Sequence, residues 1–423
     1  MKVLVINCGS SSVKFRFIET TGNSVLAKGI IERLGFDSPL FTYSGDDGED
    51  LTESVNVHNH TDAVTYIFEK LSDTRHGVIK KISDIGAIGH RFVHGGNIFR
   101  ESVVVNSGVL EKIEKILDLA PLHNPANLLG INACLDAAPE TPQIIVFDTA
   151  FHSMMQPKAY MYALPAEYYR MYGVRKYGFH GTSHYYASRR AAELMGAPVE
   201  TLKIITCHLG NGCSIDAVRD GYAVDTSMGF TPLEGLMMGT RTGDIDAAAV
   251  LYIMKKERLT LEGMNEILNR KSGLLGVSGI SPDIREIHTE ADAGNESAQL
   301  ALDMYSYRIK KYISAYTGVL GGIDALVFTG GVGENDSSIR SKSCCGLSFA
   351  GIEIDERKNE MRRNECDCEI SADGSTVRIF VISADEEIVI AREAERLISA
   401  GGEEKEPAIN RNIIKNNRIF SNE

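Results

Sequence analysis

The sequence predicts an α/β protein made of two related domains, and three observations support this fold class. Short hydrophobic runs typical of strands alternate with longer amphipathic runs typical of helices. A strand–turn–strand pattern at residues 2–18 occurs again at residues 203–218, and aligning Gly9 with Gly210 gives an offset of 210 − 9 = 201 residues. The length of 423 residues suits two or three domains, at roughly 100–200 residues each.

Composition narrows the class of protein. The 44 Lys and Arg against 57 Asp and Glu give a net charge of −13, which argues against nucleic acid or an anionic membrane as a partner. No apolar run reaches the roughly 18–20 residues that a membrane span needs, and residues 1–7 turn polar too soon for a signal peptide. The 8 Cys lack C-x-x-C spacing, so neither a zinc site nor a disulfide framework is expected. We therefore expect reduced thiols in a cytoplasmic protein.

The first half of the chain begins with a hairpin. Residues 2–7 form a β run, residues 8–12 suit a tight turn, and residues 13–18 form a second β run. A helix is expected after Asn106, a suitable N-cap, because apolar residues then recur at helical spacing. Residues 143–147 predict a buried strand that delivers Asp148 at its carboxyl end.

The second half repeats the hairpin and continues with alternating helices and strands. The expected elements are strands at 203–207 and 215–218 around the turn 208–214, a helix at 295–320, strands at 325–329 and 377–382, and a helix at 385–399. The spacing from Ser383 to Glu386 is that of a capping box, which explains Glu386 without a metal ion. From residue 401 onward the composition predicts a flexible tail.

Three glycine-rich turns follow β runs, at residues 7–12, 208–212 and 330–335. Glycine lets backbone N–H groups approach phosphate oxygens closely, and successive N–H groups form anion-binding nests. None of the three has the spacing of a Walker A loop or of a Rossmann fingerprint. Each turn alone is explained as well by a tight hairpin, but the three together favour nucleotide binding.

Arginine and histidine gather in three short polar segments, at residues 89–96, 175–184 and 239–244. An Arg beside glycines suits a site where the planar guanidinium must reach a carboxylate or a phosphate without crowding. The alternative is an ordinary exposed arginine. His180 has its own alternative, as the entry residue of a helix that Thr182 caps.

Long motifs distributed from residue 1 to about 399 resemble the acetate kinase family, which belongs to the superfamily of sugar kinases, actin and the heat-shock chaperone ATPases. The motifs are residues 5–14, 89–95, 120–125, 147–152, 177–184, 207–214, 225–235, 239–246 and 330–335. The resemblance implies an actin-like ATPase (ribonuclease H-like) architecture, with two related domains of mixed sheets flanked by helices and an interdomain cleft. It implies domains at 1–149 with 385–400 and at 150–384, followed by a flexible tail at 401–423.

The resemblance also implies the chemistry. It implies reversible, direct in-line transfer of a phosphoryl group from ATP to acetate, giving acetyl phosphate and ADP. It implies Mg²⁺, with Mn²⁺ as a substitute, and a cytoplasmic homodimer without nucleic-acid or membrane partners. Two alternatives stay open, which are a kinase for propionate or another short-chain carboxylate, and a non-kinase ATPase clamp of the actin or chaperone kind.

Matching positions imply a role for individual residues. The implied catalytic residues are Arg91, His123, Asp148, His180 and Arg241. Arg91 also holds the acetate carboxylate in this interpretation, beside a small apolar pocket for the methyl group formed by Val93, Leu122, Phe179 and Pro232.

The implied nucleotide and metal positions come from both halves of the sequence. The nucleotide-binding residues are Ser10, Ser12, Lys14, His208, Leu209, Gly210, Asn211, Gly212, Asp283, Ile284, Arg285, Gly331, Val332, Gly333, Glu334 and Asn335. Asn7 and Glu386 occupy the metal positions, where one amide and one carboxylate oxygen suit Mg²⁺ that keeps some of its waters. Asp283 and Arg285 alone are also explained as a surface ion pair.

Overall fold

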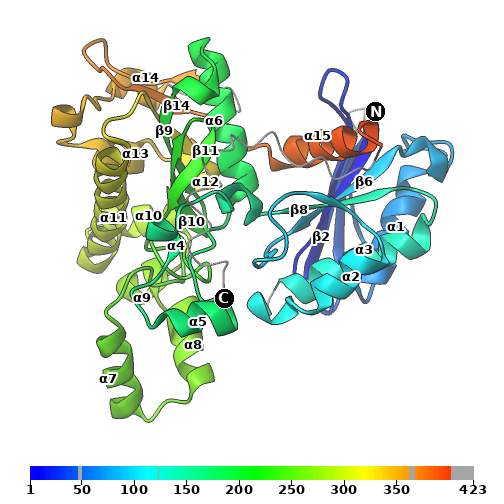
Figure 1. The fold of residues 1–423 in the computed structure, drawn as a ribbon, viewed down its shortest axis with the longest axis horizontal. Helices are drawn as coiled ribbons and strands as arrows, with labels where there is room; N and C mark the ends of the chain where they lie inside the picture. The colour runs from blue at the N-terminus through cyan, green and yellow to red at the C-terminus, as the bar shows by residue number, and fades with distance from the viewer. Residues whose placement is uncertain (46–49, 122, 362–366, 402–423) are drawn as a thin grey trace. The chain divides into compact units, whose positions relative to one another are not determined.

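The computed structural model describes residues 1–45, 50–121, 123–361 and 367–401 (Figure 1). Contacts between residues divide the chain into two compact units. Unit 1 comprises Met1–Ser153 and the chain from Asp385 onward, and unit 2 comprises Met154–Ala384. None of the helices in the described ranges is long and apolar enough to cross a membrane.

Unit 1 is built on a mixed sheet of eight strands in the order β5-β4-β3-β2-β1-β6-β8-β7. The strands are β1 (Lys2–Cys8), β2 (Ser12–Glu19), β3 (Ser24–Glu32), β4 (Leu40–Gly45), β5 (Asp50–Ser54), β6 (Ala87–Phe92), β7 (Val103–Val104) and β8 (Gln143–Phe147). Strands β1, β6 and β8 run parallel, whereas β2 pairs antiparallel with β1. The carboxyl ends of β1, β6 and β8 therefore lie at one edge of the sheet, which is where ligands bind in open α/β sheets.

Helices cover both faces of this sheet. They are α1 (His60–Leu71), α2 (Ser107–Glu114), α3 (Asn124–Ala137) and α15 (Glu386–Ser399), with 3₁₀ turns at Ile82–Asp84, Leu117–Leu119 and Ala150–His152. Ile88 on β6 belongs to the core cluster that includes residues of α1 and α3, whereas its neighbour Gly89 lies against Ile390 of α15. Because successive strand residues point to opposite faces, α1 and α3 cover one face and α15 the other (Figure 1).

The close approach of α3 to β1 requires a glycine at position 130. A Cβ there would overlap the Sγ of Cys8 and lie 3.1 Å from its Cβ, and Cys8 is buried. We expect Gly130→Ala to lower the free energy of unfolding by about 1–3 kcal/mol, the usual cost of overpacking, measured by urea unfolding. The substitution should cost less in a Cys8→Ala background, where the Sγ is missing.

A matched control for this prediction is Gly318→Ala in a helix of unit 2. A Cβ at Gly318 meets nothing within 4 Å, so the same substitution should stabilise by about 0.5–1 kcal/mol. Equal effects of the two substitutions would contradict the packing argument for Gly130.

Unit 2 is built on a second mixed sheet, of six strands in the order β11-β10-β9-β12-β14-β13. The strands are β9 (Lys203–Leu209), β10 (Cys213–Arg219), β11 (Tyr222–Thr226), β12 (Ala325–Thr329), β13 (Cys368–Glu369) and β14 (Arg378–Val381). Strand β9 pairs antiparallel with β10 and parallel with β12, which pairs parallel with β14. The five strands β11-β10-β9-β12-β14 thus repeat the order and directions of β3-β2-β1-β6-β8.

The internal repeat predicted from the sequence is confirmed at the level of single residues. Strand β9 begins 203 − 2 = 201 residues after β1, and β10 begins 213 − 12 = 201 residues after β2. The fold class is confirmed as mixed α/β with two mixed sheets flanked by helices. The sheets differ at their edges, because unit 1 adds β4, β5 and β7 and unit 2 adds β13.

Unit 2 carries most of the helices. They are α4 (Pro157–Tyr160), α5 (Ala166–Tyr172), α6 (Gly181–Met195), α7 (Ala247–Glu257), α8 (Leu261–Arg270), α9 (Gly273–Ser278), α10 (Ile284–Asp292), α11 (Glu296–Leu320), α12 (Gly330–Asn335), α13 (Ser337–Cys344) and α14 (Glu356–Glu360), with 3₁₀ turns at Val199–Thr201 and Ser348–Ala350. Helix α6 contacts β9 and β12, and α11 contacts β9 and β10. Helix α11 begins after Asn295, whose side chain caps it, and ends at Gly321, as predicted.

Three local predictions are wrong. The predicted glycine-rich turn at residues 330–335 is the short helix α12, which follows β12 directly. The predicted capping box at Ser383 does not form, because Asp385 is the N-cap of α15 and Glu386 is its first residue. Thr182 does not cap α6, because His180 is the N-cap and Thr182 lies within the helix.

Candidate functional site

The β1–β2 hairpin of unit 1 contains four of the predicted site residues. Ser10 is exposed, and the turn closes through Gly9 N–H donating to the Ser12 carbonyl at 2.8 Å. Asn7 lies opposite Lys14 in the antiparallel register. The buried Asn127 amide donates to the Cys8 carbonyl at 2.6 Å, which fixes the end of β1 against α3. The predicted anion-binding turn is therefore a defined hairpin at the ligand-binding edge of the sheet.

Arg91 is held by a carboxylate from the next strand. Its Nε and Nη2 donate to the two oxygens of Asp148 at 3.1 and 2.5 Å, and the Asp148 carboxylate is 1% exposed. The Oε2 of Glu386 is 3.8 Å from Arg91 Nε. Burial opposes the charge of the guanidinium, but the carboxylates of Asp148 and Glu386 outweigh it and raise the pKa of Arg91. Arg91 is thus permanently charged, and Asp148 orients its guanidinium group.

The remaining predicted residues near the acetate position lie at element ends. Val93 directly follows β6, is buried, and donates its N–H to the Asn127 side chain at 3.1 Å. His123 is the N-cap residue of α3. Leu122 lies outside the described residues. In unit 2, Phe179 is buried directly before His180, and the Pro232 carbonyl accepts from Arg241 Nη1 at 3.4 Å.

Acidic side chains gather at the first turn of α15. Glu387 pairs with Lys14 at 2.6 Å and Asp385 with Arg16 at 2.8 Å, which leaves Glu386 facing Arg91. Burial raises the pKa of Glu386, although the charge of Arg91 acts in the opposite direction. The amino end of a helix favours negative charge, so the helix and Arg91 both act against the effect of burial on this carboxylate.

Three histidines of unit 2 lie together, and two of them, His180 and His184, share the Ser214 hydroxyl. His180 adopts a left-handed backbone conformation, φ 56°, which is costly for a residue with a Cβ. Its Nδ1 is 2.8 Å from the Ser214 hydroxyl, and its ring centroid is 4.3 Å from that of His208. The buried His184 bonds the same hydroxyl through Nε2 at 2.7 Å. The orientation of His180 is therefore set both by the conformation of its backbone and by the contact of its Nδ1 with Ser214.

Arg241 lies beside His180. A Cβ at Gly212 would be 3.5 Å from both Arg241 Nη1 and His180 Cε1, so both side chains converge on the β9–β10 turn. Within the described part of the chain no carboxylate pairs with Arg241, and burial lowers the pKa of its guanidinium. A desolvated guanidinium without an acidic partner would gain from an anionic ligand, which would restore its charge-assisted hydrogen bonds.

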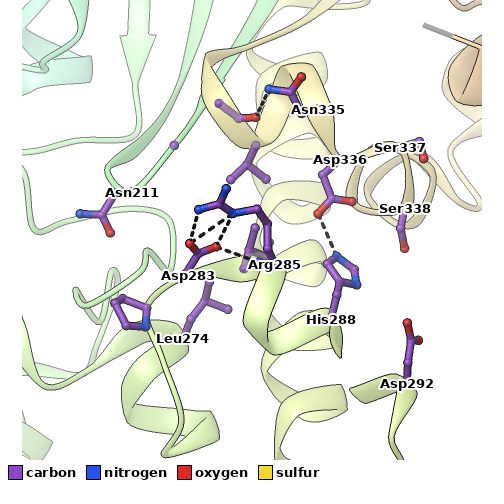
Figure 2. A pocket seen from close by; sticks show the side chains of 15 residues that line it. Asn211, Leu274, Asp283, Arg285, His288, Asp292, Asn335, Asp336, Ser337 and Ser338 are labelled. Carbon is purple, nitrogen blue, oxygen red and sulfur yellow. Dashed lines mark hydrogen bonds and ion pairs between the residues drawn. The ribbon is translucent and has the colours of Figure 1, made fainter. Parts of the chain in front are cut away.

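A pocket of unit 2 has a cavity volume of about 970 Å³ (Figure 2). Its walls come from the β9–β10 turn, α9, α10, α12 and the start of α13. The lining residues are Gly210, Asn211, Leu274, Pro282, Asp283, Ile284, Arg285, His288, Asp292, Gly331, Val332, Asn335, Asp336, Ser337 and Ser338.

The structure brings eight predicted nucleotide-binding residues to this pocket. They are Gly210, Asn211, Asp283, Ile284, Arg285, Gly331, Val332 and Asn335. The other predicted residues of unit 2 lie next to the lining without forming it, and Ser10, Ser12 and Lys14 belong to unit 1. Of the unit 2 group, His208, Leu209 and Gly212 are on the β9–β10 hairpin, while Gly333 and Glu334 are in α12.

Asp283 and Arg285 form an ion pair at the pocket wall, as Figure 2 shows. Asp283 is also the N-cap of α10, because its side chain accepts from Arg285 N–H at 2.9 Å. The Arg285 side chain, which is 87% exposed, and the Arg285 N–H lower the pKa of Asp283 to about 2. One carboxylate thus caps the helix and pairs with an exposed arginine, which agrees with the surface ion pair, and both residues also line the pocket.

The sequence analysis missed several residues around His180 and in the wall of the pocket. Ser214, His184 and Asp216 support His180, with His184 Nε2 3.4 Å from the Asp216 carboxylate. Ser214 and Asp216 come from β10 and His184 from α6, so no local sequence pattern joins them to His180. His288 and Asp336 bond to each other at 2.8 Å across the pocket wall, 48 residues apart, which no local pattern reveals.

The geometry can be compared with known proteins. The acetokinase family matches residues 2–392. The chain is 53% identical over 399 residues to the acetate kinase of Dictyoglomus turgidum, covering 94% of this chain and 98% of that one, and 52% identical over 398 residues to that of Methanosarcina thermophila, covering 94% and 97%. These matches span nearly the whole of both chains, so they cover both units.

Solved structures agree with the sequence matches. The crystal structure of Porphyromonas gingivalis acetate kinase superposes with a TM-score of 0.90 at 47% identity, covering 94% of this chain and 99% of that one. A propionate kinase from Francisella tularensis superposes with a TM-score of 0.87 at 40% identity, covering 93% and 99%. The predicted fold is thereby supported by experimental structures, and the chain belongs to the acetokinase family, as its motifs predicted.

Proposed function

We propose that this chain is an acetate kinase, a phosphotransferase that moves the terminal phosphoryl group of ATP onto the carboxylate of acetate and forms acetyl phosphate and ADP reversibly. The observation that carries the proposal is the match of the acetokinase family to residues 2–392. The arginine sites and the pocket described above add support, because the reaction needs positive charge beside the reacting anions and a place for the nucleotide.

Acetate is already ionised at neutral pH, since carboxyl groups have pKa values near ~4. The reaction therefore needs no base to create the nucleophile. Its main obstacle is repulsion between two anions, about 4 kcal/mol per pair of unit charges at about 4 Å with an effective dielectric of about 20. Positive charge and accurate positioning are the terms that the protein must supply.

On the acetate side, we assign the carboxylate to Arg91 and the methyl group to an apolar surface that includes Val93. Asp148 holds Arg91 through both oxygens, so it orients the guanidinium rather than accepting a proton from acetate. This geometry favours the positioning role over the base role for Asp148. His123, Leu122, Phe179 and Pro232 stay predicted members of the acetate site.

On the phosphate side, Arg241 and His180 are assigned to the equatorial oxygens of the transferring phosphoryl group. Arg241 has no acidic partner in the described ranges and is desolvated, so it gains most from a ligand that brings negative charge. An arginine in this role contributes about 10³–10⁵ in rate. The nucleotide is assigned to the pocket between the β9–β10 turn and α12, whose glycine backbone suits phosphates.

For the domain boundaries we keep the proposal made from the sequence. One domain comprises residues 1–149 with 385–400, and the other comprises residues 150–384.

Mg²⁺ fits the residues at the predicted metal positions. Among the described residues no group of three or more His, Cys, Asp or Glu is arranged to hold a metal ion. A cation at Asn7 and Glu386 would therefore keep waters and take phosphate oxygens, as Mg²⁺ does, and Mn²⁺ has the same ligand preference. The bound ion would neutralise phosphate charge. Glu386 contributes a half-buried carboxylate whose desolvation raises its pKa, so a nearby cation would favour its ionised form.

The test is a hydroxamate assay for acyl phosphate with ATP, Mg²⁺ and acetate, propionate or butyrate. We expect kcat/KM to be highest for acetate and to fall about 10-fold or more for each added methylene, because a small apolar pocket discriminates by about 1–3 kcal/mol per methylene. A higher kcat/KM for propionate would favour the activity of the Francisella relative. ATP hydrolysis at an equal rate without any carboxylate would contradict the kinase proposal and support an ATPase clamp.

We also propose that the chain forms a homodimer. Large apolar side chains are exposed on helices of unit 2, among them Met171 on α5, Leu251 and Tyr252 on α7, and Leu261 on α8. Light scattering on the enzyme used in the assay measures the mass, and a monomer would contradict the proposal. The cytoplasmic location stays a prediction, and the predicted tail lies, from residue 402 onward, outside the described residues.

A further inference from the structure

We propose that Lys176, Glu234 and Tyr162, here called the Lys176 triad, are positioning residues for phosphoryl transfer. They touch neither acetate nor nucleotide in this proposal. They fix the segment that carries His180 to the segment that carries Arg241. The inference rests on the proposed function, because it concerns the catalytic use of these two side chains.

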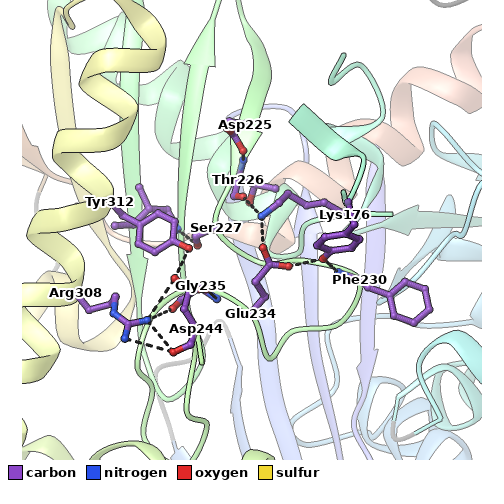
Figure 3. A network of polar contacts seen from close by, with 12 residues as sticks. Lys176, Asp225, Thr226, Ser227, Phe230, Glu234, Gly235, Asp244, Arg308 and Tyr312 are labelled. Carbon is purple, nitrogen blue, oxygen red and sulfur yellow. Dashed lines mark hydrogen bonds and ion pairs between the residues drawn. The ribbon is translucent and has the colours of Figure 1, made fainter. Parts of the chain in front are cut away.

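The triad is a compact set of polar contacts (Figure 3). Lys176 Nζ is 2.7 Å from Glu234 Oε1 and donates to the Thr226 carbonyl at 3.1 Å. The Tyr162 hydroxyl donates to Glu234 Oε2 and accepts from the Phe230 N–H at 2.8 Å. Both carboxylate oxygens of Glu234 are thus engaged, one by an ammonium group and one by a phenol.

The triad joins segments that are far apart in the sequence. Lys176 stands four residues before His180, and Glu234 stands seven residues before Arg241. Two further bonds run between the same segments, because the N–H groups of Tyr177 and Gly178 both donate to the Gly229 carbonyl, at 2.9 and 3.3 Å. The backbone entering α6 and the loop after β11 therefore form one connected unit.

The packing leaves no room for movement at the centre of the triad. A Cβ at Gly229 would collide with both the Glu234 carboxylate and the Tyr162 hydroxyl. Lys176 is 13% and Glu234 32% exposed, so their ion pair is partly withdrawn from water and exceeds an ordinary surface pair in strength. Burial and the contact with Glu234 raise the pKa of Tyr162, so its hydroxyl stays protonated and keeps donating.

The far end of the same loop is fixed separately. Asp244 accepts from the Gly235 N–H at 2.8 Å and from the Tyr312 hydroxyl at 2.8 Å, and Arg308 Nη1 is 3.3 Å from Asp244 (Figure 3). Arg308 and Tyr312 belong to α11. The loop is thus held at its far end by α11, and the Lys176 triad together with the bonds to the Gly229 carbonyl holds it to the His180 segment.

The expected consequence is kinetic. A displacement of about 1 Å between groups that act on one transition state costs about 100-fold in rate, whereas binding of each substrate alone changes little. We expect Lys176→Met and Glu234→Gln each to lower kcat about 10–100-fold, with KM for acetate and for ATP within about twofold of the wild type.

The chain supplies a matched control. Lys70, Glu53 and Tyr66 of unit 1 form a triad of the same composition, with Lys70 Nζ 2.6 Å from Glu53 and the Tyr66 hydroxyl donating to Glu53 at 2.5 Å. None of these residues is a predicted site residue. Lys70→Met should leave kcat within about twofold of the wild type. The comparison then shows that a loss of kcat in Lys176→Met comes from the Lys176 triad in particular, not from the loss of any Lys–Glu–Tyr triad.

The decisive experiment combines steady-state kinetics with hydrogen–deuterium exchange on the wild type, Lys176→Met, Glu234→Gln, the double variant and Lys70→Met. We expect faster exchange at residues 227–241 in Lys176→Met, although the substitution lies at position 176. The double variant should lose no more kcat than the worse single variant, because residues acting as one unit are not additive. Glu234→Gln keeps the shape of the side chain, which guards against a folding failure.

Two results would overturn the inference, provided that the wild type forms acetyl phosphate. One is a kcat within about twofold of the wild type in both single variants. The other is unchanged exchange at residues 227–241 in Lys176→Met. A wild type that forms no acetyl phosphate from acetate and ATP would instead contradict the proposed function, so the two failures are distinguishable.

Discussion

Replacing Arg241 with glutamine should lower kcat for acetyl phosphate formation by about 10³–10⁵-fold, the range for an arginine that stabilises a transferring phosphoryl group. Arg241 and His180 converge on Gly212, and a neutral amide at position 241 supplies no charge there. Lysine should recover only part of the rate, because an ammonium group lacks the planar fork that bonds two oxygens at once. The hydroxamate assay measures both variants.

The same substitution should not reduce stability. Arg241 is desolvated without an acidic partner in the described part of the chain, and removing such a charge relieves a cost of folding. The melting temperature of Arg241→Gln should equal or exceed that of the wild type. Arg396→Gln is a suitable control, since Arg396 pairs with Glu393 on α15, away from every predicted site residue. Near-normal activity of Arg241→Gln would remove Arg241 from the proposed mechanism.

Replacing Arg91 with glutamine should lower kcat/KM for acetate by about 10²–10⁴-fold, the equivalent of the 3–5 kcal/mol that breaking a buried ion pair costs. Here stability should fall as well. The Asp148 carboxylate is 1% exposed, and the substitution leaves it buried with a neutral partner. Arg91→Gln should therefore unfold at a lower urea concentration than Arg241→Gln.

A double variant separates the two roles of Arg91. Arg91→Gln with Asp148→Asn replaces a buried ion pair by two neutral amides, so we expect much of the lost stability to return. Activity should not return, because no cation then faces acetate. Recovery of activity in the double variant would show that Arg91 acts only by balancing Asp148, and that acetate binds elsewhere.

Features set by local sequence were predicted well. The hairpins at β1–β2 and β9–β10, the strand before Asp148, and helix α11 between Asn295 and Gly321 follow from alternation, periodicity and caps. The prediction of a capping box was wrong because Ser383 and Asp385 are both good N-cap residues, and the tertiary position of α15 selects Asp385. The prediction of a turn at residues 330–335 was wrong because the chain closes into the six-residue helix α12 directly after β12, in spite of three glycines.

Contacts between distant residues were not available from the sequence alone. The Arg91–Asp148 pair joins residues 57 apart, and Tyr162 and Glu234 are 72 apart. The family resemblance supplied Arg91 and Asp148 as members of one site, but no local pattern couples Lys176 to Glu234. Likewise the pocket brings together segments from Gly210 to Ser338, whose proximity depends on how α9, α10 and α13 pack.

The position of α15 has a consequence for synthesis on the ribosome. This helix covers one face of the unit 1 sheet, and the amino group of Met1 lies 3.3 Å from the Glu395 carboxylate within it. Unit 2 is one continuous stretch, Met154–Ala384, so all of its residues emerge before α15 is made. Nascent unit 1, although it is made before unit 2, keeps one apolar face of its sheet uncovered until residues 386–399 are translated, and chaperones that shield such surfaces have their target there.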